Sequence, residues 1–217
     1  MTDNQAGKPL NDEAPLDPAA MLAIVERQQR SITNQMGGFV PVMTAVWGAA
    51  WLLGFGTLFG QQVTGFPLWI AIVVFVLLLL GAAAVSTVFG IRAGRGIRAS
   101  WQSRFTGTVY GVTWSFGSLA LSAIGGGLMY NGMSDALAQH FYPAIYLFFI
   151  GIMYIIAGAI WPTVFTIVSG GQLVLIGVIS LFIPQPFHLL FLALAAGLGF
   201  FVLAILHRVG QKRPARG

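Results

Sequence analysis

The sequence contains no cysteine, and few of its residues are charged. Without thiols, disulfide bonds, cysteine nucleophiles and thiolate metal sites are excluded. Charged side chains make up 8% of the 217 residues, whereas apolar ones make up 57%, and the mean hydropathy is +0.82. Such a chain has too few polar groups to cover a water-soluble domain of this size. The composition therefore points to a membrane.

Six stretches of about 20 residues lack Asp, Glu, Lys and Arg altogether. A helix of about 20 apolar residues is long enough to cross a hydrocarbon core of about 30 Å. The sequence therefore predicts an all-α, polytopic membrane protein with six transmembrane helices. The predicted spans are residues 39–60, 67–89, 107–130, 143–161, 163–183 and 187–206.

Prolines support five of the predicted span starts. Proline lacks a backbone N–H and has a fixed φ angle, so the first turn of a helix accepts it readily. We therefore expect a span to begin close to each of these five prolines, which are Pro41, Pro67, Pro143, Pro162 and Pro186.

All 11 basic residues fall into three segments: before the first span, between the second and third, and after the sixth. The three opposite connections carry no Lys or Arg, and their one acidic residue is Asp135. Lys and Arg near the ends of spans are held on the cytoplasmic side of a membrane. We therefore predict a multi-pass protein of the cell (inner or plasma) membrane, with both termini cytoplasmic.

The segments outside the spans are short. Residues 1–16 are polar and predict a disordered tail. Residues 17–37 predict a short amphipathic helix that lies in the cytoplasm or at the membrane interface, with Asp17 as its N-cap. The transmembrane domain is expected over 38–206, and a basic cytoplasmic tail over 207–217.

Small residues repeat at helical spacing along the third span. In lipid, close approach over small residues and hydrogen bonds between helices drive helix association. We therefore expect span 3 to be the central, best-buried helix; the alternative is that its serines line a pore. The repeat consists of Gly107, Gly111, Ser115, Ser118, Ser122 and Gly126. Similar packing is expected at Gly56 and Gly60 in span 1, and at Ala193 and Gly197 in span 6.

Three other residues are candidates for a solute path. Gln172 follows two glycines in the fifth span, and loosened helices at mid-membrane form substrate sites in many carriers. Trp47 and Trp51 share one face of the first span. Together with Ser115, Ser118 and Ser122, these side chains form either a solute path or a polar cluster that links helices.

Four arginines lie between the second and third spans. With Trp101, they predict a surface that contacts anionic lipid headgroups or docks a cytosolic protein such as an ATPase or a regulator. The arginines are Arg92, Arg95, Arg98 and Arg104. Because the topology already explains this charge, we expect no nucleic-acid partner.

Two segments carry a resemblance to a known group of proteins. The stretch "MLAIVERQQRSI" (21–32) followed by "VWGAAWLLGFG" (46–56) is similar to uncharacterised six-span membrane proteins of high-GC Gram-positive bacteria. Members of that group are loosely labelled transporters. The resemblance implies a six-span membrane protein of similar length, and it carries over no site residue.

The spans contain no carboxylate of the kind that usually couples a carrier to protons or cations. We therefore expect a transporter-like or permease-like subunit that moves a small or apolar solute and has no proton or cation coupling of its own. The alternative is a scaffold, sensor or assembly partner that docks a cytosolic protein through the amphipathic helix and the arginine-rich loop. No enzymatic activity, cofactor or metal is expected, and a homo-oligomer is left open.

Overall fold

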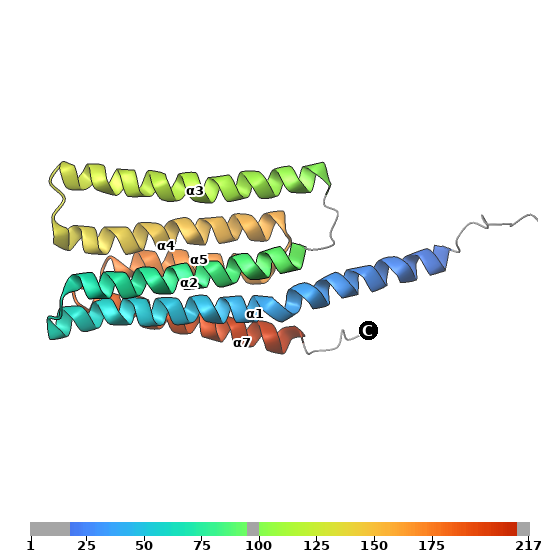
Figure 1. Ribbon diagram of the computed structural model, residues 1–217, viewed down its shortest axis with the longest axis horizontal. Helices are drawn as coiled ribbons and strands as arrows, with labels where there is room; N and C mark the ends of the chain where they lie inside the picture. Colours follow the sequence, from blue (N-terminus) through green and yellow to red (C-terminus); the bar gives the residue numbers. More distant parts are fainter. Residues whose placement is uncertain (1–17, 95–99, 212–217) are drawn as a thin grey trace, which may run out of the picture.

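The computed structural model describes residues 18–94 and 100–211, which are helical apart from short turns (Figure 1). The prediction of an all-α protein is therefore confirmed for this part of the chain. Helices that are joined by a turn or a loop run antiparallel to one another (Figure 1). The helices are α1 (Pro18–Thr64), α2 (Leu68–Gly94), α3 (Trp101–Tyr130), α4 (Asp135–Ile160), α5 (Val164–Ser180), α6 (Phe187–Leu192), the π-helix η1 (Ala193–Leu198) and α7 (Gly199–Gln211).

Five segments are long and apolar enough to cross a membrane: Val40–Thr64, Leu68–Arg92, Trp101–Tyr130, Asp135–Ile160 and Phe187–Leu206. The last of these joins α6, η1 and most of α7 into one rod. The remaining apolar helix, α5, has 17 residues and therefore rises about 25 Å. The fold is that of a helical membrane protein with five full-length candidate spans and one shorter apolar helix.

Two prolines lie within helices instead of at their starts. α1 joins the predicted amphipathic helix and the first span into one helix of 47 residues that contains Pro41. Figure 1 shows that this helix bends along its length, and we attribute the bend to Pro41, since a proline removes a helical hydrogen bond. Pro143 lies inside α4, which begins at Asp135. There Ser134 caps the helix, its hydroxyl accepting a hydrogen bond from Leu137 N at 3.3 Å.

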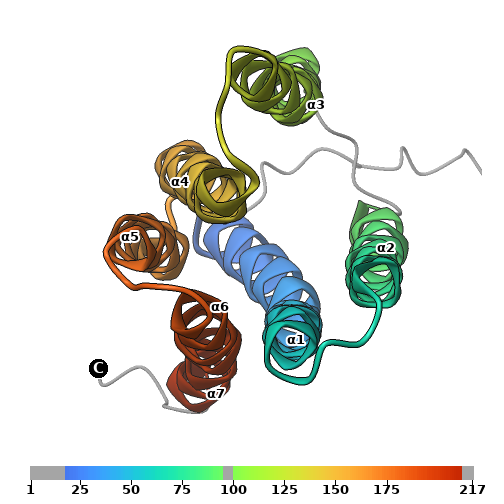
Figure 2. The same ribbon diagram turned by 90° about the vertical axis from the view of Figure 1, so that its left-hand side faces the viewer.

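α3 lies at the edge of the bundle, where it packs on α4 (Figure 2). Only 6% of the most apolar 18-residue segment of α3 is buried, against 44% of the corresponding segment of the last candidate span. Aromatic rings of α4 meet α3 at Gly117 and Gly125, whereas nothing lies within 4 Å of a side chain added at Gly107, Gly111 or Gly126. The expectation of a central, best-buried third span is therefore wrong, although Ser118 and Ser122 of its small-residue repeat contact α4.

The closest helix pair is instead α4 and α5. A Cβ added at Gly151 would lie 2.6 Å from the carbonyl oxygen of Gly170, and one added at Gly177 would lie 3.0 Å from that of Ala144. These residues recur every seven positions on each helix, with Gly158 continuing the row on α4. Two helical turns separate successive contacts, so the backbones approach each other along the whole pair.

α1 packs almost as closely on the last rod. A Cβ at Gly48 would lie 2.9 Å from the carbonyl oxygen of Gly197, and one at Gly197 would lie 2.8 Å from Leu52 Cα. The expected packing role of Gly197 is therefore confirmed. In contrast, no atom lies within 4 Å of a side chain added at Gly56 or Gly60, so the contact predicted there is not formed among the described residues.

The helices fall into two groups. α1 packs on α2 and on the α6–η1–α7 rod, while α4 packs on α3 and α5. The groups meet where α5 contacts the rod. Figure 2 shows α2 and α3 at separate edges of the molecule, with α1 and α4 between them.

The two ends of the bundle differ in charge. The end of α2, the start of α3 and the end of α7 lie together, at the right of Figure 1, and carry the exposed Arg92, Arg104 and Arg208. We call this the basic end. The opposite end holds the turns at residues 65–67, 131–134 and 181–186, and we call it the turn end.

Candidate functional site

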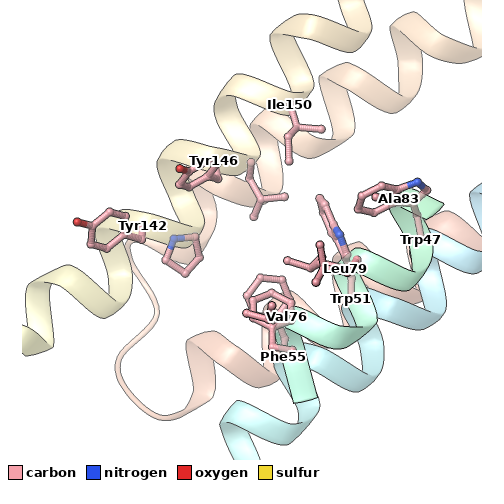
Figure 3. Close-up of a pocket in the computed structure, with 13 residues that line it drawn as sticks. Trp47, Trp51, Phe55, Val76, Leu79, Ala83, Tyr142, Tyr146 and Ile150 are labelled. Atoms are coloured by element: carbon pink, nitrogen blue, oxygen red, sulfur yellow. The ribbon is translucent and has the colours of Figure 1, made fainter. Parts of the chain in front are cut away.

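A cavity of about 560 Å³ lies between the two helix groups. One wall comes from α1 and α2, and the facing wall comes from α4 (Figure 3). Its volume falls in the range of about 300–1,000 Å³ that is usual for small-molecule sites. The lining residues are Trp47, Trp51, Phe55, Phe75, Val76, Leu79, Leu80, Ala83, Tyr142, Pro143, Tyr146, Leu147 and Ile150. None of them carries a charge.

The α-helical period explains how each wall forms. Trp47, Trp51 and Phe55 are spaced four residues apart and therefore share one face of α1. Tyr142 and Tyr146 have the same spacing on α4. Each helix thus presents a continuous row of large side chains to the cavity.

The α1 wall is held by contacts between aromatic rings. Trp51 meets Phe55 edge-on with ring centroids 6.3 Å apart, and it meets Phe200 of α7 edge-on at 5.2 Å. Phe55 also packs on Phe75 of α2 at 5.0 Å. Because edge-to-face contacts add to the energy of burial, this wall is a fixed part of the protein core.

Two polar groups on the walls are already hydrogen-bonded to other residues of the protein. Trp47 Nε1 donates a hydrogen bond to Ser86 Oγ of α2 at 2.9 Å. The Tyr146 hydroxyl donates to the Ser118 carbonyl oxygen of α3 at 3.0 Å and lies 2.6 Å from Ser122 Oγ. Figure 3 shows the Tyr146 hydroxyl on the far side of its ring from the α1 and α2 side chains. These bonds orient the rings and leave the cavity surface apolar.

A second cavity of about 500 Å³ adjoins the first at the turn end, and the two share Tyr142 and Pro143 as lining residues. Its walls include polar side chains from both groups, namely Gln61 and Gln62 of α1 and Asp135 and Gln139 of α4. The combined space is therefore apolar in the interior of the bundle and polar at its turn end.

Hydrogen bonds join the two helix groups at the turn end. Gln62 Nε2 of α1 donates to Gln139 Oε1 of α4 at 2.6 Å. His188 Nε2 of α6 lies 3.3 Å from the Gln139 carbonyl oxygen, and its ring stacks on that of His140 with centroids 4.1 Å apart. Gln185, just before α6, donates to Gln139 Oε1 at 3.1 Å. Gln139 is thus the centre of this cluster, which we call the Gln139 cluster.

The sequence did not single out the Gln139 cluster. Its glutamines lie close to span ends, where polar residues are common, so their positions carried no distinctive signal. Among the described residues, no group of three His, Cys, Asp or Glu side chains is placed to hold a metal ion.

The structure brings together only part of the predicted solute path. Trp47 and Trp51 line the cavity, while Ser118 and Ser122 contact its wall through Tyr146. Ser115 is exposed and bonds to its own helix at Gly111. Gln172 lies outside the cavity, against Gly199 of α7.

The predicted surface for lipid headgroups or a partner lies at the basic end. Arg92 ends the second candidate span, and Arg104 lies in the first turn of α3; both are exposed. Trp101 is 72% exposed and stacks on Phe105 at a centroid distance of 5.3 Å. Arg95 and Arg98 lie outside the described residues.

Comparison of the chain with protein-family models, with curated proteins and with solved structures finds no match. The resemblance of residues 21–32 and 46–56 therefore stays a prediction. The cavity and the Gln139 cluster are therefore the candidate functional features of the described residues.

Proposed function

We propose that this integral membrane protein is a permease-like subunit that binds a small apolar solute in the cavity between α1, α2 and α4. The observation that carries the proposal is the cavity itself, which is large, uncharged and lined by aromatic and aliphatic side chains. Membrane solutes of low polarity suit such a surface because neither partner gives up hydrogen bonds to water on binding.

The position of the cavity supports passage as well as binding. It lies between two groups of helices that meet mainly through α5 and the last rod. At the turn end, the Gln139 cluster joins the groups by hydrogen bonds. Carriers commonly expose a central site by rocking one helix bundle against another. In this protein, breaking the Gln139 cluster would open the cavity toward the turn end.

We further propose that all six apolar segments span the membrane, with the basic end in the cytoplasm. α5 reaches from the basic end to the turn end in Figure 1, and its 17 residues fall at the lower limit for a span. Its tight pairing with α4 helps it to cross, because the neighbouring helix covers much of its surface. The cell membrane is the expected location.

The cysteine-free chain allows a direct test of this topology. We expect a membrane-impermeant maleimide to label Phe182→Cys, in the turn after α5, on intact cells. Ser100→Cys, just before α3, should react only after the cells are permeabilised. Labelling of both positions from the same side would refute the proposed crossing of the membrane.

Binding in the cavity can be tested by photolabelling with benzophenone, a neutral apolar reagent. In lipid nanodiscs, we expect adducts on the cavity residues, detected by mass spectrometry and suppressed by excess fluorene. Ala83→Phe should reduce the adducts by filling the cavity, whereas Ala84→Phe on the neighbouring exposed position should not. Adducts that are spread evenly over lipid-facing residues, without protection by fluorene, would contradict the proposal.

The basic end fits a role in holding the protein at anionic lipid headgroups. Exposed Trp and Arg side chains are typical of the membrane interface, and Trp101 with Arg92 and Arg104 provides both. Replacing both arginines by Gln should weaken the enrichment of phosphatidylglycerol around the protein, as measured by native mass spectrometry. An unchanged lipid preference would favour a cytosolic protein as the partner of this surface.

A further inference from the structure

The cavity wall contains a hydrogen-bond donor at Trp51. Trp51 lines the cavity and is only 5% exposed, yet no described residue accepts a hydrogen bond from its Nε1–H. Indole N–H groups in apolar surroundings usually find a partner, because an unpaired donor there costs free energy. Among the described residues, the enclosed side-chain N or O atom without a partner is His188 Nδ1, so the Trp51 N–H is not sealed in the core and a ligand can reach it.

The surroundings of Trp51 explain why the protein itself provides no acceptor. Its ring is held edge-on between Phe55 and Phe200, and it belongs to a cluster of buried apolar side chains. Trp47 makes a useful comparison, since it lies one helical turn away on the same wall. Its Nε1–H is paired with Ser86. Both tryptophans thus line one cavity (Figure 3), and only the N–H of Trp47 is paired within the described part of the protein.

From this difference we infer that the solute is a neutral, largely aromatic molecule with one acceptor oxygen, which accepts a hydrogen bond from Trp51 Nε1. The inference rests on the proposed function, because it identifies the solute class of the same cavity. The absence of any charged lining residue makes a charged solute costly to bury. The aromatic rings of both walls favour planar, apolar surfaces. Aromatic ketones belong to this class.

A matched pair of competitors isolates the acceptor. Fluorenone and fluorene have nearly the same shape, but only fluorenone carries a carbonyl oxygen. Each would protect the full-length protein in nanodiscs from benzophenone photolabelling, after correction for its partitioning into the lipid. We expect fluorenone to protect at a concentration roughly three- to tenfold lower than fluorene, which is the effect of one hydrogen bond in a membrane protein.

Two variants then test whether Trp51 is the donor. Trp51→Phe should bring the ratio of the two protecting concentrations close to one, because it removes the N–H and leaves an aromatic ring. Trp47→Phe is the matched control and should keep the ratio of the wild-type protein, since its N–H is already paired. Changes in cavity volume affect both competitors alike and cancel in the ratio.

The outcomes separate this inference from the proposed function. If fluorene and fluorenone protect the wild-type cavity equally, the inference that the solute carries an acceptor oxygen is refuted, while the proposed apolar binding site is supported. If Trp51→Phe keeps the preference for fluorenone, Trp51 is not its donor. If neither compound protects and the adducts show no preference for the cavity, the proposed function fails, and the inference fails with it.

Discussion

The closest approach of two helices in this protein predicts opposite effects for the same substitution at adjacent residues. Gly170 and Gly171 follow each other on α5, but only Gly170 faces α4. A Cβ at Gly170 would lie 2.8 Å from Ile155 N and still closer to the carbonyl oxygen of Gly151, whereas nothing lies within 4 Å of one at Gly171. Gly170→Ala must therefore separate the helices, and Gly171→Ala need not.

The magnitude follows from this geometry. An ordinary contact between non-bonded atoms is about 3.5–4.0 Å, and the atoms in the way belong to the backbone of α4, which has no rotamer to change. Inserting one methyl group into such a contact costs about 1–3 kcal/mol. Both variants gain the same helix propensity, about 1 kcal/mol for Gly to Ala. The difference between them thus measures the cost of separating the helices.

Thermal unfolding of the purified protein in detergent, followed by circular dichroism at 222 nm, measures this difference. A free-energy difference of about 2 kcal/mol in a protein of this size corresponds to about 4–8 °C in Tm. We expect Gly170→Ala to melt below Gly171→Ala by that amount, and Gly171→Ala to melt at or above the wild type. Equal Tm values for the two variants would show that α4 and α5 are not in close contact at Gly170.

Two further predictions concern the path and its closure. Gln172→Leu should leave the protection by fluorene unchanged, because the amide lies outside the cavity. The Tm should stay equal or rise, because the half-buried amide bonds to no described residue. A loss of protection by fluorene would show that Gln172 belongs to the solute path. Spin labels on cysteines at Val63 and Leu137, exposed positions on the two groups at the turn end, should give two distances by double electron–electron resonance. Gln139→Leu should increase the population with the longer distance. A single narrow distance that is the same with and without this substitution would refute the rocking of one helix group against the other.

The helical class and most helix positions could be predicted from the sequence, because long uncharged apolar stretches have few alternatives. The role of the small residues could not. Both α3 and the α4–α5 pair contain glycines at helical spacing, and lipid accepts an exposed glycine as readily as a packed one. What distinguishes the true contact is the seven-residue repeat at Ala144 and Gly151, which face Gly177 and Gly170 on the neighbouring helix. The repeat on α3 has no such counterpart on a neighbour.

The candidate site could be predicted only in part, for a similar reason. The four-residue spacing of Trp47 and Trp51 correctly placed both on one face, since it depends on one helix alone. Gln172 was chosen because it is polar, yet what a polar residue faces depends on how α5 rotates against α7, which no local pattern reports. The Gln139 cluster is assembled from residues far apart in the sequence, and only the fold brings them together.

In the proposed carrier, the strength of the Gln139 cluster limits how the cavity can open. Hydrogen bonds between helices in a membrane contribute about 0.6 kcal/mol each on average, so the bonds from Gln62, Gln185 and His188 to Gln139 together hold the groups by about 2 kcal/mol. That corresponds to a population ratio of about 20 to 30. Such a weak link suits a protein whose spans carry no carboxylate away from their ends for coupling to an ion gradient. Both the closed and the open state must then be populated by thermal motion alone, and a solute that binds the open state about a hundredfold better than the closed state suffices to make the open state the major one.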